Sequence, residues 1–235
     1  MLEHCTLCPR LCGANRNAGE HGFCGADARI RIGLASLHQW EEPCLSGTNG
    51  AGTVFFCHCP LGCVYCQNHD ISGLDADASG ICTDISGLAD TFLSLQQRGA
   101  HNIDLVTPTQ YAAQLTQAIP LARRRGLTIP IVYNCGGYER VETLRELEGL
   151  VDIYLPDMKY SDPKLAGILS AAPDYVEIAK AAIAEMYRQV GSAVIEDEIM
   201  QRGMIVRHLM LPGELDNTLG VLDWFSEAFP KGDVL

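Results

Sequence analysis

The chain has 235 residues, 47% of them apolar, and a formal net charge of −12 at pH 7. Its length allows one large buried core, and its acidity argues against a nucleic-acid partner, because phosphate binding requires clustered Lys and Arg. No apolar run reaches the roughly 20 residues that a membrane span needs. The eleven cysteines follow a start without a basic and apolar leader, so we expect a cytoplasmic protein whose cysteines are metal ligands or buried thiols.

Residues 1–50 are predicted to form a loop-rich extension with a cysteine set of its own. The set consists of Cys5, Cys8, Cys12 and Cys24, flanked by turn-forming Gly and Pro. Four soft ligands of this kind suit a tetrahedral zinc ion or a closed iron–sulfur cluster. Both metals remain open because their cysteine spacings overlap, and unligated thiols are the third interpretation.

The end of this extension contains a strand pattern and a group of polar residues. Alternation at residues 29–34 predicts a short strand. Trp40 is expected to pack the extension onto the main domain. Glu41 and Glu42 are either solvated or lie near a cofactor.

A loop with three cysteines follows the apolar strand pattern at residues 53–57. Cys59, Cys63 and Cys66 are separated by three and two residues, so their thiolates can reach three corners of one [4Fe–4S] cluster. Ordinary electron-transfer clusters take four cysteines, and an open coordination position is typical of a catalytic metal site. The fourth iron is therefore expected to bind a substrate or cofactor. Cys57 is interpreted as a strand thiol, with cluster ligation as the alternative.

From residue 53 onward, strand and helix patterns alternate. Strands separated by helices of this length imply an α/β fold with parallel pairing through right-handed crossovers. Five such units are complete, and residues 233–235 are expected to begin a sixth strand. Pro120 is expected to kink or divide the helix that contains it. Strands are predicted at 53–57, 103–107, 129–134, 151–155 and 204–211, and helices at 85–99, 141–149, 175–190 and 219–229, with a further helix after Thr109.

Polar motifs follow the predicted strands at their carboxyl ends, where active sites of such folds form. They are the cysteine loop, Thr107 to Thr109, Asn134 with the glycines after it, Asp157 with Lys159, and the turn at residues 211–213.

The cysteine motif, with aromatic Tyr65 before its last cysteine, resembles that of the radical S-adenosylmethionine superfamily. The segments 105–109, 155–160 and 207–213 resemble its PflX-like subfamily, which is related to pyruvate formate-lyase activating enzyme, and the resemblance covers nearly the whole chain. It implies a partial (β/α)6 barrel over residues 51–235, cut at the start of the sixth strand. It also implies a [4Fe–4S] cluster and S-adenosylmethionine as cofactors, with reductive cleavage to a 5′-deoxyadenosyl radical that abstracts hydrogen.

The resemblance also implies roles for individual residues. For two of these roles, which are listed below, an alternative stays open. Asp157 and Lys159 can form a surface ion pair, and Arg207 can be a structural charge neutraliser. The implied roles are adenine contact for Tyr65, amino-group contacts for Thr107 and Thr109, carboxylate pairing for Lys159, ribose or cation contact for Asp157 with Asn134 beside it, and a barrel-facing or carboxylate-paired position for Arg207.

Two classes of function remain open. The first is a radical enzyme acting on a small molecule, a peptide or a glycyl-radical enzyme, with a flavodoxin- or ferredoxin-type electron donor. The activase form of this prediction rests on family analogy. The second is a non-catalytic iron–sulfur or zinc protein that serves as an electron carrier or scaffold.

Overall fold

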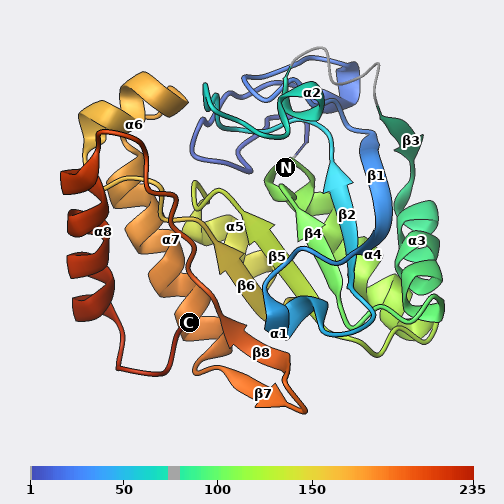
Figure 1. Cartoon of the computed structure of the whole chain (residues 1–235). Coiled ribbons are helices and arrows are strands. Elements are labelled where there is room, and N and C mark those ends of the chain that lie inside the picture. Colours follow the sequence, from blue (N-terminus) through green and yellow to red (C-terminus); the bar gives the residue numbers. More distant parts are fainter. Residues whose placement is uncertain (1, 74–79) are drawn as a thin grey trace.

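One sheet organises the fold. The computed structural model describes residues 2–73 and 80–235, and within these ranges eight strands form a sheet in the order β3-β1-β2-β4-β5-β6-β8-β7 (Figure 1). Its five central neighbours, from β2 to β8, run parallel, and β1, β3 and β7 pair antiparallel at the two ends. The α/β class predicted from the sequence is confirmed. The strands are β1 Ile30–His38, β2 Ala51–Phe56, β3 Ile81–Thr83, β4 Ile103–Val106, β5 Ile131–Cys135, β6 Ile153–Pro156, β7 Val194–Glu196 and β8 Ile199–Met204.

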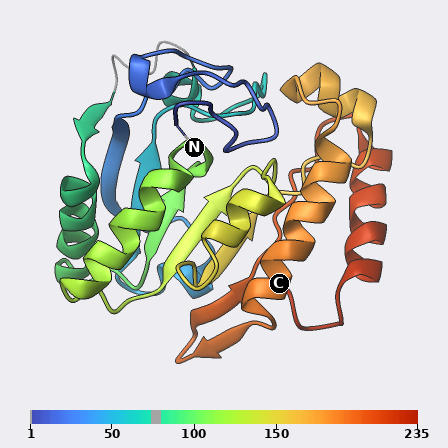
Figure 2. The same ribbon diagram turned by 180° about the vertical axis from the view of Figure 1, so that it is seen from behind.

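Helices cover one face of the sheet. Figure 2 shows α3, α4, α5 and α7 across this face, with α8 beside α7. Strand residues such as Leu105 and helix residues such as Leu115 and Ile119 share one buried core. None of the described helices is long and apolar enough to cross a bilayer. The helices are α1 Pro43–Ser46, α2 His69–Ser72, α3 Ile85–Gln97, α4 Ala112–Arg124, α5 Val141–Glu146, α6 Pro163–Ser170, α7 Tyr175–Val190 and α8 Leu215–Ala228.

The opposite face of the sheet carries a small apolar cluster and a set of polar side chains. Leu45 of α1 packs there with Val132 and Met200. Since side chains alternate along a strand, Asn134 lies on the same face as Val132, and Asp104 is the cross-strand neighbour of Val132. This face is therefore where polar groups from several strands can meet.

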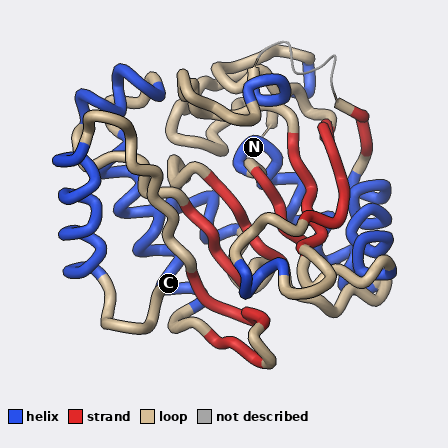
Figure 3. Tube along the Cα trace, in the orientation of Figure 1, coloured by secondary structure: helices blue, strands red, loops and turns tan. Residues whose placement is uncertain are grey.

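The segment before β1 is mostly loop and lies at the carboxyl ends of the parallel strands (Figure 3). Arg10 donates to the carbonyl oxygens of Pro60 at 2.9 Å and Ala171 at 2.6 Å, and Thr143 Oγ1 donates to the carbonyl of Leu7 at 2.8 Å. The segment therefore packs directly on the loop after β2, on the end of α6 and on α5. β1 lies within residues 1–50, so the sheet begins before the expected boundary at residue 51.

Three predictions about the chain up to α4 are corrected. The strand predicted at 29–34 is longer, because β1 pairs with β2 along its length up to His38. The packing role predicted for Trp40 is wrong, since this residue is 87% exposed just beyond the end of β1. Pro120 lies inside α4 and does not divide it.

The strand predicted at 204–211 is also wrong in its bounds. β8 begins at Ile199, after a two-residue hairpin turn in which Asp197 and Glu198 both have positive φ, as a type I′ turn requires. Beyond Met204 the chain stays beside β6 through single backbone hydrogen bonds and an isolated Asp157–Arg207 bridge. Leu235 pairs with this continuation, donating to the carbonyl of Met204 and accepting from the amide of Val206.

Gly137, in the loop after β5, occupies a position that excludes a side chain. Its φ of +77° is in the left-handed region, and a Cβ there would lie 2.2 Å from the carbonyl oxygen of Asp157. Gly149 has the same φ but no atom within 4 Å of such a Cβ.

We expect Gly149→Ala to lower the free energy of unfolding by about 1 kcal/mol and Gly137→Ala by about 2 kcal/mol more, measured by urea unfolding. Equal losses would contradict this account.

Candidate functional site

The three-cysteine loop is held by the end of α6. The amide of Gly62 donates to the carbonyl of Ser170 at 3.2 Å, and that of Val64 to the carbonyl of Leu169 at 2.9 Å. The last carbonyls of a helix have no intrahelical partner, so the loop satisfies them. The helices predicted from the sequence did not include α6, although Asp162 followed by Pro163 is a helix-start signal.

Each of the three loop thiols has a hydrogen-bond donor beside it. Ser170 Oγ donates to Cys63 Sγ at 2.9 Å, the amide of Leu61 to Cys59 Sγ at 3.4 Å, and Ser72 Oγ lies 3.5 Å from Cys66 Sγ. Burial raises the pKa of Cys59 to about 12. Donors next to sulfur stabilise the thiolate form that metal ligation requires, so this donor set fits an iron–sulfur cluster.

Gln110 holds the backbone that leads into this loop. Its Nε2 group donates to the carbonyls of Cys57 and His58, both at 2.9 Å, and of Thr107 at 2.8 Å. The loops after β2 and β4 are thereby joined through one buried amide. The sulfur of Cys57 packs against Gly80, where a Cβ would lie 2.5 Å from it. This position fits the interpretation of Cys57 as a strand thiol.

A cluster of opposite charges lies on the polar face of the sheet. Lys159 Nζ donates to Asp157 Oδ2 at 2.6 Å, Arg207 Nε donates to Asp157 Oδ1 at 3.2 Å, and Arg207 Nη2 donates to Asn134 Oδ1 at 2.6 Å. The surface-pair alternative is wrong, because the side chains of Lys159 and Asp157 are only 17% and 22% exposed. Burial opposes ionisation, yet Lys159 and Arg207 hold the pKa of Asp157 below its ordinary value.

Three further carboxyl groups surround Arg207. Its Nη1 lies 3.5 Å from Glu41 Oε2 and 3.8 Å from Glu42 Oε1, so Glu41, whose side chain is 9% exposed, is not a solvated surface group. Asp104 is fully buried and accepts from Asn134 Nδ2 at 3.4 Å. Burial and the neighbouring Glu41 raise the pKa of Asp104 well above its ordinary value. Asp104 was missed, although a single acid inside an apolar strand is an available signal.

The two predicted threonines lie after β4 in different environments. Thr107 has a φ of +56°, a left-handed conformation that is strained for a β-branched residue and is often found at functional sites. Thr109 Oγ1 donates to Glu139 Oε1 at 2.5 Å, and Tyr133 donates to the other carboxylate oxygen at 3.2 Å. Burial raises the pKa of Glu139 to about 7. Glu139 was not anticipated from the sequence.

Tyr65 belongs to a chain of hydroxyl groups that ends at a loop thiol. Its OH lies 2.6 Å from the OH of Tyr160, which lies 2.6 Å from Ser170 Oγ, the donor to Cys63. Tyr65 thus lies close to Cys63, and adenine contact remains a prediction. Tyr160 ends the segment 155–160 that carries the family resemblance, but no partner was predicted for it, and the sequence carried no specific signal for Ser170.

The four N-terminal cysteines lie in the loop segment before β1. Cys5, Cys8 and Cys24 are buried and Cys12 is exposed. Burial raises the pKa of Cys24, and the neighbouring Cys5 and Cys12 raise it further. Burial raises the pKa of Cys8 to about 12. Across residues 2–73 and 80–235, no group of three or more His, Cys, Asp or Glu side chains is arranged to hold a single metal ion, so metal binding stays a prediction.

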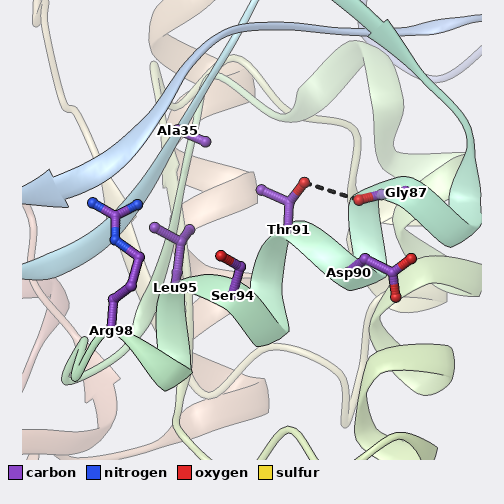
Figure 4. A pocket seen from close by; sticks show the side chains of 7 residues that line it. All are labelled: Ala35, Gly87, Asp90, Thr91, Ser94, Leu95 and Arg98. Carbon is purple, nitrogen blue, oxygen red and sulfur yellow. Dashed lines mark hydrogen bonds between the residues drawn. The ribbon is translucent and has the colours of Figure 1, made fainter.

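Two surface hollows lie apart from these groups. One of about 310 Å³ lies between α3 and β1, where Thr91 Oγ1 donates to the carbonyl of Gly87 (Figure 4). The other, of about 370 Å³, surrounds the turn at residues 211–213. Neither contains a cysteine or a member of the charge cluster. The first is lined by Ala35, Gly87, Asp90, Thr91, Ser94, Leu95 and Arg98.

Comparison with known proteins gave limited similarity. No protein-family model matches the chain. An uncharacterized protein of Methanocaldococcus jannaschii is 30% identical over 224 residues, which are 92% of this chain and 59% of that protein. The chain therefore spans about three fifths of the length of this relative. The crystal structure of QueE from Escherichia coli aligns with a TM-score of 0.42 and 12% identity, covering 86% of this chain and 92% of QueE.

Arg207 is expected to be required for stability because it neutralises several carboxylates at once. Replacing one partner of a buried charge pair leaves an uncompensated charge, so Arg207→Met should lower the free energy of unfolding by about 3 kcal/mol. Arg125→Met is a matched control, since Arg125 pairs with Asp90 at 2.7 Å on the surface; it should cost less than about 1 kcal/mol. Denaturant unfolding measures both. A loss at Arg207 as small as that at Arg125 would contradict the role of the cluster.

Glu139 should make stability depend on pH. Its ordinary pKa of 4.5 applies to the unfolded chain, whereas its folded pKa is about 7. The folded chain therefore binds the Glu139 proton more tightly than the unfolded chain does. The stability that this tighter binding contributes is complete below pH 4.5 and is lost as the pH rises through about 7. The loss is on the order of 3 kcal/mol. We expect it in urea unfolding of the parent relative to Glu139→Gln, and parallel pH profiles for the two chains would refute it.

Proposed function

We propose that the chain is a radical S-adenosylmethionine enzyme. The observation that carries this proposal is the placement of three loop thiols, each beside a hydrogen-bond donor, next to the Asp157–Lys159–Arg207 cluster. Lys159 lies beside this loop, since a Cβ on Gly136 would be 3.5 Å from Lys159 Cε and 2.8 Å from Leu61 Cδ1. A zwitterionic ligand such as S-adenosylmethionine needs both signs of charge close to an open iron.

The roles proposed for individual residues are those that the resemblance to radical S-adenosylmethionine enzymes implies. Cys59, Cys63 and Cys66 hold the [4Fe–4S] cluster, and Lys159 pairs with the methionyl carboxylate. Asp157 and Asn134 face the ribose or a cation, while Tyr65 contacts the adenine. When bound, the two cofactors supply a 5′-deoxyadenosyl radical. The protein orients the cofactor and excludes water. Thr107, Thr109 and Arg207 complete the contacts to the cofactor.

The finer form of the fold prediction is part of the same proposal. We take the parallel strands β2, β4, β5, β6 and β8 to form the wall of a partial (β/α)6 barrel. Two observations support this: the crossover helices lie on one face, and the polar side chains lie on the other. Ligands of parallel α/β folds bind at the carboxyl ends of the strands, where the cysteine loop lies.

The wider function is proposed as well. The N-terminal cysteines hold zinc or a second iron–sulfur cluster, and a flavodoxin- or ferredoxin-type protein in the cytoplasm donates electrons. The hydrogen donor is a glycyl-radical enzyme, another peptide or a small molecule. The electron-carrier alternative would need a fourth cysteine at the cluster, and its candidate, Cys57, packs against Gly80.

An anaerobic assay tests the proposal. After cluster reconstitution, S-adenosylmethionine and dithionite are added, and 5′-deoxyadenosine is quantified. We expect product from the parent chain and from Cys82→Ala, which removes an exposed thiol of β3, but none from Cys63→Ala, because an incomplete ligand set cannot hold the cluster. A reconstituted cluster with no product, and with no change in its spectrum on addition of S-adenosylmethionine, would refute the proposal.

A further inference from the structure

Two buried side chains on the polar face of the sheet have oxygen atoms without a hydrogen-bond partner. Thr53 on β2 and Asp104 on β4 are both 0% exposed, and they are neighbours in the parallel register of the two strands. Side chains at such positions lie on the same face of a sheet. Within residues 2–73 and 80–235, neither Thr53 Oγ1 nor Asp104 Oδ1 finds a partner. Because a buried polar atom without a partner is costly, both atoms call for a group that these residues do not supply.

The Asp104 carboxyl belongs to a network that also reaches solvent. Its Oδ2 accepts from Asn134 Nδ2 at 3.4 Å, and Asn134 Oδ1 accepts from Arg207 Nη2 at 2.6 Å. Arg207 Nη1 lies 3.5 Å from Glu41 Oε2 and 3.8 Å from Glu42 Oε1. Glu42 Oε2 is a third buried oxygen without a partner in the described part of the chain. The side chains of Glu42 and Arg207 are 27% and 33% exposed, so the network runs from solvent to the buried Asp104.

Carboxyl groups outnumber cations in this network. Lys159 is already paired with Asp157 at 2.6 Å, and Arg207 is shared among three carboxyl groups. Burial and the neighbouring Glu41 raise the pKa of Asp104 well above its ordinary value, as expected for a buried acid without a cation at ion-pair distance. One further cation would let Asp104 ionise. The acids are Glu41, Glu42, Asp104 and Asp157, and the cations are Lys159 and Arg207.

The kind of cation follows from the groups that remain unpaired. A primary ammonium group has three N–H donors and no acceptor, and it therefore suits Thr53 Oγ1, Asp104 Oδ1 and Glu42 Oε2. A metal ion is not the better ligand, because no group of three or more His, Cys, Asp or Glu side chains in the described ranges is arranged to hold one. The network thus favours the ammonium group of an organic molecule.

We propose that Thr53, Asp104 and Glu42, with Glu41 beside them, bind the ammonium group of a substrate, so that the substrate is a primary amine. The amino group of S-adenosylmethionine is assigned to Thr107 and Thr109, so the ammonium group bound here belongs to a second molecule. That this molecule is the substrate rests on the proposed function. The binding site itself depends on neither a cluster nor a cofactor.

The test is a binding measurement on the full chain without added metal or cofactor. Butylammonium is titrated at constant ionic strength and followed by calorimetry, with butanol as the uncharged match and potassium as the inorganic cation. We expect butylammonium to bind to one site and the two controls not to bind at the same concentration. Asp104→Asn keeps the shape of the side chain but removes its charge, so it should weaken butylammonium binding about 10-fold or more.

Thr53→Val separates a role in binding from a role in the fold. It removes a buried hydroxyl without a partner, so the free variant should be at least as stable in urea as the parent, yet it should bind butylammonium about 3-fold more weakly. A threonine with a purely structural role would leave the affinity unchanged. This variant also keeps the test decisive if Asp104→Asn does not fold.

Glu139→Gln is the matched control. Glu139 is a buried carboxyl group, 2% exposed, but its partners are Thr109 and Tyr133, so its replacement should leave the affinity for butylammonium unchanged.

Four results would overturn the proposal. They are absence of butylammonium binding to the parent, equal binding of potassium or butanol, parental affinity in Asp104→Asn or Thr53→Val, and a loss in Glu139→Gln as large as that in Asp104→Asn. A failure of S-adenosylmethionine cleavage would leave these results unaffected, because no cofactor takes part in the measurement.

Discussion

The clamp of Asp157 between Lys159 and Arg207 is the constraint on which the polar face depends. A buried carboxylate stays ionised only when cations or hydrogen-bond donors compensate for lost water. Here the cations come from the segment after β6 and from the continuation of β8, where the Asp157–Arg207 bridge joins the two backbones. Arg207 extends the same network to Asn134 on β5 and to Glu41 beyond β1. Charge pairing thus fixes four separate segments relative to one another.

Packing against α7 holds the loops that carry this clamp. The hydroxyl of Tyr175 lies 2.8 Å from the carbonyl oxygen of Gly136 and 2.7 Å from that of Asp157, and it accepts from the amide of Lys159 at 3.0 Å. One buried side chain therefore connects the loops after β5 and β6. This approach is possible only because Gly137 has no side chain to collide with the Asp157 carbonyl. The position of the charged groups depends on a tyrosine and a glycine that carry no charge.

Sequence patterns identified the elements with strong periodicity and the residues at strand ends. The helix predicted at 175–190 coincides with α7, and Asn134, Asp157, Lys159 and Arg207 meet as expected, because the ends of parallel strands share one edge of a sheet. The predictions that were wrong concern features that depend on tertiary contacts. Periodicity cannot reveal that Asp197 and Glu198 form the hairpin turn before β8, since Glu198 has a positive φ at the position where such turns usually have glycine.

Buried polar residues were also hard to predict. Glu139 and Tyr160 find their partners on other strands and loops, so no local pattern identifies these contacts. Asp104 is recognisable as an acid inside an apolar strand, but its partner Asn134 lies on the neighbouring strand. Trp40 is the opposite case: an apolar residue was predicted to be packed, but the fold leaves it exposed. Cluster binding by the loop thiols and metal binding by the N-terminal thiols remain predictions. Their spacing indicates the ligands but not the metal.

The two thiol sets share one scaffold, and this links their stability. Arg16 donates to the backbone of Gln110, and the Gln110 amide donates to the carbonyls of Cys57 and His58 immediately before Cys59. Arg10 donates to the carbonyl of Pro60, the next residue of that loop. Loss of order in the N-terminal segment would leave buried carbonyls without donors, at a cost of about 1–3 kcal/mol each. The geometry of the Cys59 loop therefore depends on an ordered N-terminal cysteine segment, even though the two sets of cysteines are separate.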